Sequence, residues 1–417
     1  MALARQQEGT DTRSPVSPGS PARALCPPAD GTGAPGTLTP GRAALHSGDR
    51  GPAARAPSRV CAVSEGRSRA VAEVVMQRRR PSREILMGDS ADVYFARADE
   101  ILAAEGLDPV VTMEVFSRRS GVLCGIDEAK VLIAHVLGDC PPGEAQVEAL
   151  SDGDSFDSRE VVLRIRARYR AFGLYETAIL GMIAQSTGWA TAAREVVEAA
   201  APAPVISFGA RHVHPDVTDT LDYAAIVGGC VGASTPAGAR LAGLSPTGTM
   251  PHSLVLIFGD TVRAAEAFDR VLAKDVPRVV LVDTFRDEAE EALRVAHALG
   301  DRLYGIRLDT PAERGRVTAD LVHEVRARLD QAGFQHVRII ISGGLDPERI
   351  RYFQEAGAAV DSFAVGSHIS GARPIDFTGD LKEIDGRAIA KRGRIPGPTE
   401  SPRLQPIDLS AWRASSS

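Results

Sequence analysis

Six short segments of the sequence bring chemically active side chains and glycines directly after runs of apolar residues. An aromatic ring, guanidinium groups, imidazoles, carboxylates and bare backbone all occur in them, so together they could bind an anionic substrate such as a sugar phosphate. Any one segment is weak support, but six in succession are difficult to explain by packing alone. The segments are Phe208-Gly209-Ala210-Arg211-His212, Gly248-Thr249-Met250-Pro251-His252, Asp283-Thr284-Phe285, Arg307-Leu308-Asp309, Ser342-Gly343-Gly344-Leu345-Asp346 and Gly366-Ser367.

The glycines of the last two segments predict a phosphate site. Gly343 and Gly344, together with Gly366, leave backbone N–H groups uncovered near expected helix starts. Backbone N–H groups in that position hold a phosphate without a side-chain charge. Ser-Gly-Gly alone would also fit an ordinary turn.

The charged residues indicate what else the site could bind. Asp283 and Asp309 could bind Mg²⁺, bind ribose hydroxyls, orient a histidine, or only cap helices. Arg211 and Arg307 could hold a carboxylate or a pyrophosphate through two parallel hydrogen bonds. The pair His212 and His214 resembles a metal motif, but no third ligand follows at the usual spacing, so we expect no protein-held metal site there.

Short apolar strands alternate with amphipathic helices from residue 204 onward, which predicts parallel βαβ units. Such a series forms a closed α/β barrel or a doubly wound sheet. A barrel is favoured because it would bring all six polar strand ends to one face. The absence of a GxGxxG motif after a strand argues against a dinucleotide-binding site. The expected strands are Pro204–Phe208, Leu244–Thr249, Arg278–Val282, Leu303–Ile306, Val337–Ile341 and Ser362–Val365, with helices over 260–273, 286–299 and 315–333.

A mixed α/β domain is expected before the barrel. Helical spacing over 89–106 and 174–200 flanks two alternating strands, Val110–Phe116 and Val162–Arg170. In the second strand the arginines alternate with apolar residues, which predicts a half-buried strand with a solvated basic face.

The first 80 residues differ from the rest of the chain. They hold 12 arginines, no lysine, six acids, nine prolines and nine glycines, and few large apolar residues before Val60. Such a segment buries too little apolar surface to offset its chain entropy, so we expect disorder, and Met76 and Met87 are plausible alternative starts. The predicted division is 1–84 extension, 85–203 α/β domain, 204–372 barrel, 373–397 segment returning to the first domain, and 398–417 flexible tail.

Composition excludes several classes of protein. The net charge of −6 is opposite to that of a nucleic-acid binder, and no run of apolar residues is long enough to cross a membrane. The five cysteines are scattered without a CxxC pair, which fits a reducing, cytoplasmic location.

The order and spacing of these motifs resemble nicotinate phosphoribosyltransferase, with the archaeal-type branch of the nicotinate/quinolinate phosphoribosyltransferase family the most similar. The similarity extends from Ala91-Asp-Val-Tyr94 to Lys391-Arg-Gly393, some 300 of the 417 residues. The motifs that carry it are Ser207-Phe-Gly-Ala-Arg-His-Val-His-Pro215, Gly248-Thr-Met-Pro-His-Ser253, Val282-Asp-Thr-Phe285, Arg307-Leu-Asp-Thr310 and Ile341-Ser-Gly-Gly-Leu-Asp346.

The resemblance implies an activity and a fold. Members transfer phosphoribose from phosphoribosyl pyrophosphate to nicotinate, in NAD biosynthesis, giving nicotinate mononucleotide and pyrophosphate. ATP hydrolysis is coupled through a phosphohistidine, so ATP and Mg²⁺ are the expected co-substrate and cofactor. The implied fold is an N-terminal α/β domain and an irregular, TIM-like α/β barrel, and the implied assembly is a homodimer or higher homo-oligomer with shared active sites.

The resemblance also implies roles for individual residues. His252 matches the phosphorylated histidine, and Asp283 and Asp309 match the acidic pair near ribose and metal. The other implied roles are ring stacking by Phe208 and by Tyr94 of the partner subunit, substrate binding by Arg211 and Arg307, and 5′-phosphate binding by Ser342, Gly343, Gly344, Val365 and Gly366.

The sequence is also compatible with other substrates and with a binding role. Quinolinate or nicotinamide could replace nicotinate as the substrate, and an inactive barrel could merely bind a sugar phosphate. After Val227-Gly-Gly-Cys230 some relatives carry an acid that would contact the ring, whereas Val231 stands here, which leaves the choice between acid and amide open.

Overall fold

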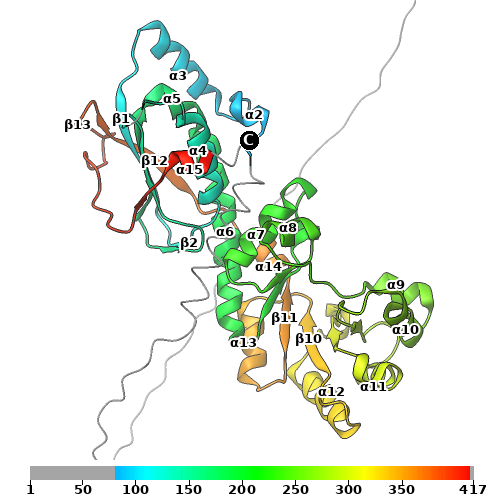
Figure 1. Cartoon of the computed structure of the whole chain (residues 1–417). Coiled ribbons are helices and arrows are strands. Elements are labelled where there is room, and N and C mark those ends of the chain that lie inside the picture. The colour runs from blue at the N-terminus through cyan, green and yellow to red at the C-terminus, as the bar shows by residue number, and fades with distance from the viewer. Residues whose placement is uncertain (1–79, 142, 414–417) are drawn as a thin grey trace, which may run out of the picture. The chain divides into compact units, whose positions relative to one another are not determined.

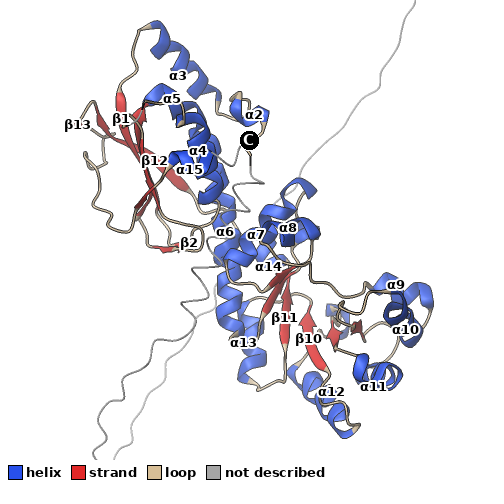
Figure 2. Ribbon diagram, viewed as in Figure 1, coloured by secondary structure: helices blue, strands red, loops and turns tan. Residues whose placement is uncertain are grey.

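The computed structural model describes residues 80–141 and 143–413. Of the disordered extension expected over 1–84, residues 1–79 lie outside the described residues, and the helix α2 (Arg83–Leu86) already begins within the rest. The described chain contains two six-stranded sheets, one antiparallel and one parallel, each with its own hydrophobic core (Figures 1 and 2). The predicted fold class, an α/β domain followed by an irregular barrel, is confirmed.

The antiparallel sheet belongs to the first domain and has the strand order β13-β12-β1-β5-β3-β14. Alternating apolar residues of β1 and β5 bury one face of this sheet, as their pattern predicts. Its strands are β1 (Val110–Ser117), β3 (Gln146–Ala149), β5 (Val161–Arg168), β12 (Phe377–Ile384), β13 (Arg387–Ala388) and β14 (Gln405–Pro406), and β2 (Gly121–Val122) pairs separately with β4 (Ser155–Phe156).

Helices of this domain include one that serves both cores. α6 (Glu176–Ala200) contributes Ile179 and Ile183 to the core of the antiparallel sheet and Val196 to that of the parallel sheet. The remaining helices are α2 (Arg83–Leu86), α3 (Val93–Ala104), α4 (Ile126–Leu137), α5 (Tyr169–Phe172) and α15 (Leu409–Arg413).

Two expectations for this domain are wrong. The basic face of β5 is not simply solvated, because Arg164 pairs with buried Glu114 at 2.8 Å and with Glu148 at 2.8 Å. The described part of the expected tail, residues 398–413, is not loose, since Thr399 donates to Glu114 through its N–H at 2.8 Å and its hydroxyl at 2.7 Å, and β14 pairs with β3. A buried carboxylate must be hydrogen-bonded, and Glu114 recruits both Arg164 and this distant segment.

The parallel sheet is curled and has the strand order β7-β6-β11-β10-β9-β8. All of its recorded pairings are parallel, and helices such as α12 and α13 run alongside it (Figure 2). The strands are β6 (Val205–Ser207), β7 (Gly232–Ala233), β8 (Val279–Leu281), β9 (Gly305–Leu308), β10 (Arg338–Ser342) and β11 (Ser362–Val365). The helices are α7 (Thr218–Val227), α8 (Pro236–Leu241), α9 (His252–Phe258), α10 (Thr261–Val271), α11 (Glu288–Leu299), α12 (Ala319–Gln331), α13 (Pro347–Glu355) and α14 (Ser367–Ser370).

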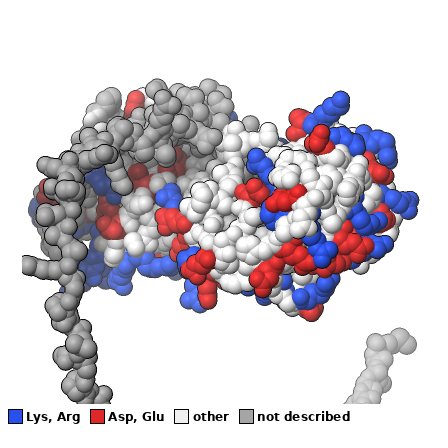
Figure 3. Space-filling view, turned by 90° about the horizontal axis from the view of Figure 1, so that it is seen from below, with Lys and Arg blue, Asp and Glu red and all other residues white. Residues whose placement is uncertain are grey.

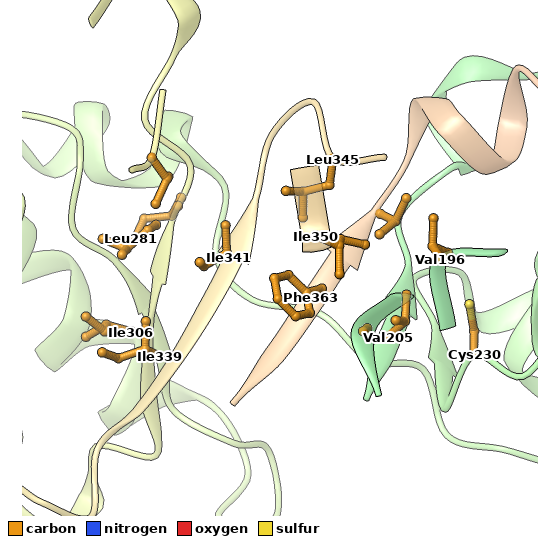
Figure 4. Close-up of a cluster of buried hydrophobic side chains, with 14 of the residues drawn as sticks. Val196, Val205, Cys230, Leu281, Ile306, Ile339, Ile341, Leu345, Ile350 and Phe363 are labelled. Carbon is orange, nitrogen blue, oxygen red and sulfur yellow. The ribbon is translucent and has the colours of Figure 1, made fainter. Parts of the chain in front are cut away.

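The core of this sheet comes from strands that are apolar along their whole length, as expected when helices cover a parallel sheet. Phe363 of β11 lies between Ile341 of β10 and Val205 of β6, and Ile306 lies beside Ile339 (Figure 4). All five of these side chains are buried. This packing fixes the strand ends from which the site is built.

One of the six expected barrel strands is wrong and one was missed. Leu244–Thr249 forms no strand, because Pro246 lacks an N–H group and Gly248 weakens an extended segment. The sixth strand is instead β7, a two-residue strand that pairs with β6. Its two residues, Gly232 and Ala233, give no apolar run from which to predict a strand.

Candidate active site

The strand ends of the parallel sheet surround a cavity of about 660 Å³. Residues that follow β6, β7, β10 and β11 line it, together with Arg307 and Asp309 from the end of β9 and the loop that leads into α9. The lining residues are Phe208, Ala210, Arg211, His212, Ser234, Gly248, Thr249, Met250, Pro251, His252, Arg307, Asp309, Ser342, Gly343, Gly344, Ala364, Gly366 and Ser367. Ligands of α/β barrels bind at this carboxyl end of the strands.

His252 and Asp283 form a hydrogen-bonded pair at one side of the cavity. The Nε2 of His252 lies 3.2 Å from Oδ1 and 3.1 Å from Oδ2 of Asp283, whose side chain is buried. The hydrogen bond to Asp283 raises the pKa of His252, with a smaller contribution from Asp309. Because the carboxylate occupies Nε2, the other ring nitrogen, Nδ1, is the one available for chemistry.

The guanidinium of Arg307 lies near the ring of Phe208 and the carboxylate of Asp309. Its Nη1 donates to Thr249 Oγ1 at 2.6 Å, its Nη2 lies 3.6 Å from Asp309 Oδ2, and its guanidinium is 5.6 Å from the ring centre of Phe208. Burial lowers the pKa of this guanidinium, although Asp309 and Asp283 oppose the shift. The Nε of Arg307 is buried and has no hydrogen-bond partner among the described residues.

The glycines keep side chains out of the part of the cavity expected to hold phosphate. Gly343 has φ of 92° and Gly344 has φ of 62°, backbone conformations that favour glycine. A Cβ atom on Gly343 would lie 2.7 Å from Asp309 Oδ1, and one on Gly366 would lie 3.0 Å from the carbonyl oxygen of Phe208. Asp309 and the strand ends therefore pack directly against bare backbone.

The structure brings most of the predicted site residues to this one cavity. Asp283 does not line the cavity, but it is hydrogen-bonded to His252, which does. Val365 is buried, and its carbonyl oxygen accepts a 2.8 Å hydrogen bond from the N–H of Phe208. Tyr94 lies on α3, exposed, with its hydroxyl donating to Asp92 at 3.2 Å. The single chain does not place Tyr94 at the cavity, and its role across a subunit interface stays a prediction. The predicted residues that line the cavity are Phe208, Arg211, His252, Arg307, Asp309, Ser342, Gly343, Gly344 and Gly366.

Val231 does not lie at the cavity of this chain. Val231 precedes β7 and so lies at the amino end of that strand, it is exposed, and it is absent from the cavity lining. The residue that follows β7 and does line the cavity is Ser234. Recognising the two-residue strand would have identified Ser234, because the carboxyl ends of neighbouring parallel strands share one edge.

No group of three or more His, Cys, Asp or Glu side chains suited to a metal ion occurs within residues 80–141 and 143–413. Magnesium ordinarily binds through only one or two carboxylates plus substrate phosphates. Asp309, which is partly exposed and faces the cavity, fits that requirement, whereas both oxygens of Asp283 are directed at His252.

The surface of the described residues carries mixed charge. Basic and acidic side chains are interspersed over the face shown in Figure 3. In the portion of the chain that the structure describes, no helix has both the length and the apolar character needed to cross a membrane.

Comparisons with known proteins agree with this architecture. Two family models match, the N-terminal domain of quinolinate phosphoribosyl transferase over residues 92–187 and its C-terminal domain over residues 189–380. A crystal structure of nicotinate-nucleotide pyrophosphorylase from Pyrococcus furiosus is 42% identical, with a TM-score of 0.70, over 76% of this chain and 81% of that one.

Curated relatives carry a different name. Nicotinate phosphoribosyltransferase pncB2 of Mycobacterium tuberculosis is 33% identical over 251 residues, 59% of this chain and 53% of that protein. Nicotinate phosphoribosyltransferase of Bacillus subtilis is 29% identical over 224 residues, 53% of this chain and 45% of that protein. The chain thus spans about half the length of these relatives. Taken with the two domain matches and the Pyrococcus structure, the similarity shows that the chain belongs to the nicotinate and quinolinate phosphoribosyltransferase family.

Proposed function

We propose that this protein transfers the phosphoribosyl group of phosphoribosyl pyrophosphate to the ring nitrogen of nicotinate, forming nicotinate mononucleotide and pyrophosphate. The observation that carries the proposal is the convergence on one cavity of glycine strand ends, the Phe208 ring, and the His252–Asp283 pair. Each part of the substrate pair has a complementary group in that cavity.

The base is assigned to the region around Phe208. The flat pyridine ring would stack on Phe208, and its carboxylate would pair with Arg211, with the Ser234 hydroxyl as an additional donor. Arg307 already interacts with Thr249 and Asp309. The cavity therefore offers one guanidinium without a partner among the described residues, which suits a single carboxylate.

The sugar phosphate is assigned to the glycine strand ends. The 5′-phosphate would accept hydrogen bonds from the bare backbone of Gly343, Gly344 and Gly366, and Asp309 would bind ribose hydroxyls. The unpartnered Nε of Arg307 would donate to an anionic oxygen of the substrate. Mg²⁺ held by Asp309 and the pyrophosphate oxygens would neutralise the departing charge.

The transfer itself requires positioning more than acid–base chemistry. The bond from the anomeric carbon to the pyrophosphate oxygen breaks, its electron pair leaves with pyrophosphate, and the lone pair of the pyridine nitrogen forms the new bond to carbon. The chain contributes by holding the ring nitrogen against the anomeric carbon and by surrounding the leaving group with donors.

We further propose that ATP hydrolysis is coupled to the transfer through His252. The γ-phosphoryl bond of ATP breaks, ADP leaves, and a phosphorus–nitrogen bond forms at Nδ1, the nitrogen that Asp283 leaves free. Asp283 would stabilise the ring as the phosphoryl group arrives, and water later releases phosphate. The doubly negative phosphoryl group on His252 would attract the side chains of Arg307 and Arg211 and so fix their positions around phosphoribosyl pyrophosphate.

A homodimer or higher homo-oligomer, with Tyr94 of one subunit completing the site of another, belongs to the same proposal. Tyr94 is exposed on α3, none of whose residues is buried in the single chain. The test of assembly is the mass of the purified protein in solution.

Quinolinate is the second candidate, because the Pyrococcus furiosus protein whose crystal structure is 42% identical to this chain is named nicotinate-nucleotide pyrophosphorylase. The deciding assay supplies phosphoribosyl pyrophosphate and Mg²⁺ with nicotinate, nicotinamide or quinolinate separately, each with and without ATP. Nicotinate mononucleotide formed from nicotinate alone, and faster with ATP, is the expected result. Product from quinolinate with release of CO₂ would overturn the substrate and the role of His252.

A further inference from the structure

A buried carboxylate without a cationic partner lies directly behind the cavity. Asp222 of α7 is completely buried, and no ion pair to it occurs among the described residues. Burial raises its pKa. Such a group lowers stability unless its oxygens are well satisfied, so its position next to a functional site calls for an explanation.

Three donors from two strand ends converge on Asp222. The hydroxyl of Ser207 donates to Oδ1 at 3.1 Å, while the hydroxyl and the N–H of Thr235 donate to Oδ2 at 2.6 Å and 3.2 Å. Ser207 ends β6 and Thr235 follows β7 by two residues. Both strand ends are therefore tied to one carboxylate.

The residues held by these bonds adjoin the base site. Phe208 follows Ser207, and Ser234 precedes Thr235, and both Phe208 and Ser234 line the cavity. Leu221, which precedes Asp222 on α7, packs closely against Gly209: a Cβ atom added to Gly209 would lie 3.0 Å from the Cδ2 atom of Leu221. By contrast, the glycines assigned to the 5′-phosphate follow β10 and β11 and make no hydrogen bond with Asp222.

We infer that Asp222 is a positioning residue that sets the separation of Phe208 and Ser234 and thereby the affinity for the pyridine base. It contacts no substrate and acts only through Ser207 and Thr235. The inference rests on the proposed function, in which Phe208 and Ser234 bind nicotinate.

The geometry distinguishes a conservative from a disruptive change. In Asp222→Asn the amide oxygen can keep both donors of Thr235, and the amide N–H can donate to Ser207, whose hydroxyl can rotate to accept. In Asp222→Ala both strand ends lose their shared acceptor. The matched control is Asp219→Ala on the same helix, because the Asp219 carboxylate accepts only from the adjacent Thr220 among the hydrogen bonds seen.

The experiment measures KM for nicotinate and KM for phosphoribosyl pyrophosphate in the full chain, together with calorimetric Kd for nicotinate. Asp222→Ala should raise KM and Kd for nicotinate about tenfold, leave KM for phosphoribosyl pyrophosphate within about twofold, and lower the melting temperature. Asp222→Asn should restore the nicotinate values, and Asp219→Ala should match the wild type. Ser207→Ala and Thr235→Val should each reproduce part of the Asp222→Ala effect.

A purely structural role gives a different pattern. It would lower the melting temperature and the active fraction of Asp222→Ala while both KM values stay at the wild-type level. That result, or an equal rise in the KM values for nicotinate and phosphoribosyl pyrophosphate, would overturn the inference about Asp222 while leaving the proposed function intact. If the wild-type protein neither binds nor converts nicotinate, the proposed function fails and the inference fails with it.

Discussion

Replacing Gly343 by alanine tests the assignment of the glycine strand ends to phosphate. Gly343 has φ of 92°, and a Cβ there would lie 2.7 Å from Asp309 Oδ1. Ordinary contacts of a Cβ begin at 3.4 Å, so the carboxylate must retreat by about 0.7 Å, the difference of the two distances, or the backbone must rotate. Either response displaces a group that we assign to the ribose and metal.

Gly333→Ala is the matched control for backbone strain. Gly333 has φ of 86° but has open space where a Cβ would be added, and it follows α12, away from the cavity. Both variants should lose about 1–2 kcal/mol of unfolding free energy, because a non-glycine residue in left-handed backbone costs about that amount. Only Gly343→Ala should also misplace Asp309.

The expected catalytic loss follows from that displacement. A misplacement approaching 1 Å can reduce catalysis by about 100-fold. We therefore expect kcat/KM for phosphoribosyl pyrophosphate to fall about 100-fold further in Gly343→Ala than in Gly333→Ala, equivalent to about 2.7 kcal/mol. Steady-state rates and chemical unfolding of the two variants supply the comparison. Equal losses in both would refute the assignment of Gly343 to the sugar-phosphate site.

Three further predictions concern titratable residues. His252→Ala should abolish stimulation by ATP while some uncoupled transfer persists, and rates measured with and without ATP would contradict this if stimulation survived. Asp283→Asn should move the acid limb of the ATP-dependent pH–rate profile to lower pH, because Asp283 raises the pKa of His252 and a neutral ring must accept the phosphoryl group; an unmoved limb would count against the pairing. Burial raises the pKa of Asp152 from 3.8 to about 8, so the folded state binds this proton more tightly than the unfolded state and loses stability as pH rises from about 4 to 8. Melting temperatures should accordingly depend less on pH in Asp152→Asn than in the wild type, and parallel curves would show that another group is responsible.

The polar strand ends could be predicted from sequence for a physical reason. Strands buried on both faces are short continuous apolar runs, as in β10 and β11, and their first polar residues mark the carboxyl edge of the sheet. Parallel topology then brings those residues together whatever the order of the strands. This is why Arg307, Asp309, Gly343 and Gly366 line one cavity although the order of the strands was unknown.

The features that sequence reasoning missed depend on partners far away in the chain. β7 is extended only because β6 pairs with it, and its two residues, Gly232 and Ala233, carry no pattern of their own. The segment around Thr399 is ordered because Glu114, 285 residues earlier in the chain, needs donors. Local composition gives no information about either requirement.

The state of Arg307 supports the proposal that the cavity binds an anion, because this arginine keeps an unused donor among the described residues. Its side chain is mostly buried, its Asp309 partner lies at 3.6 Å, beyond ordinary hydrogen-bond distance, and its buried Nε has no partner in the described part of the chain. A buried donor left unsatisfied costs about 1–3 kcal/mol. An oxygen of a bound phosphate or pyrophosphate would satisfy this donor, so part of the binding free energy would come from relieving a cost that the free protein already carries. Replacing Arg307 by a smaller residue would remove both the cost and the gain, which is why its effect should fall on substrate affinity more than on stability.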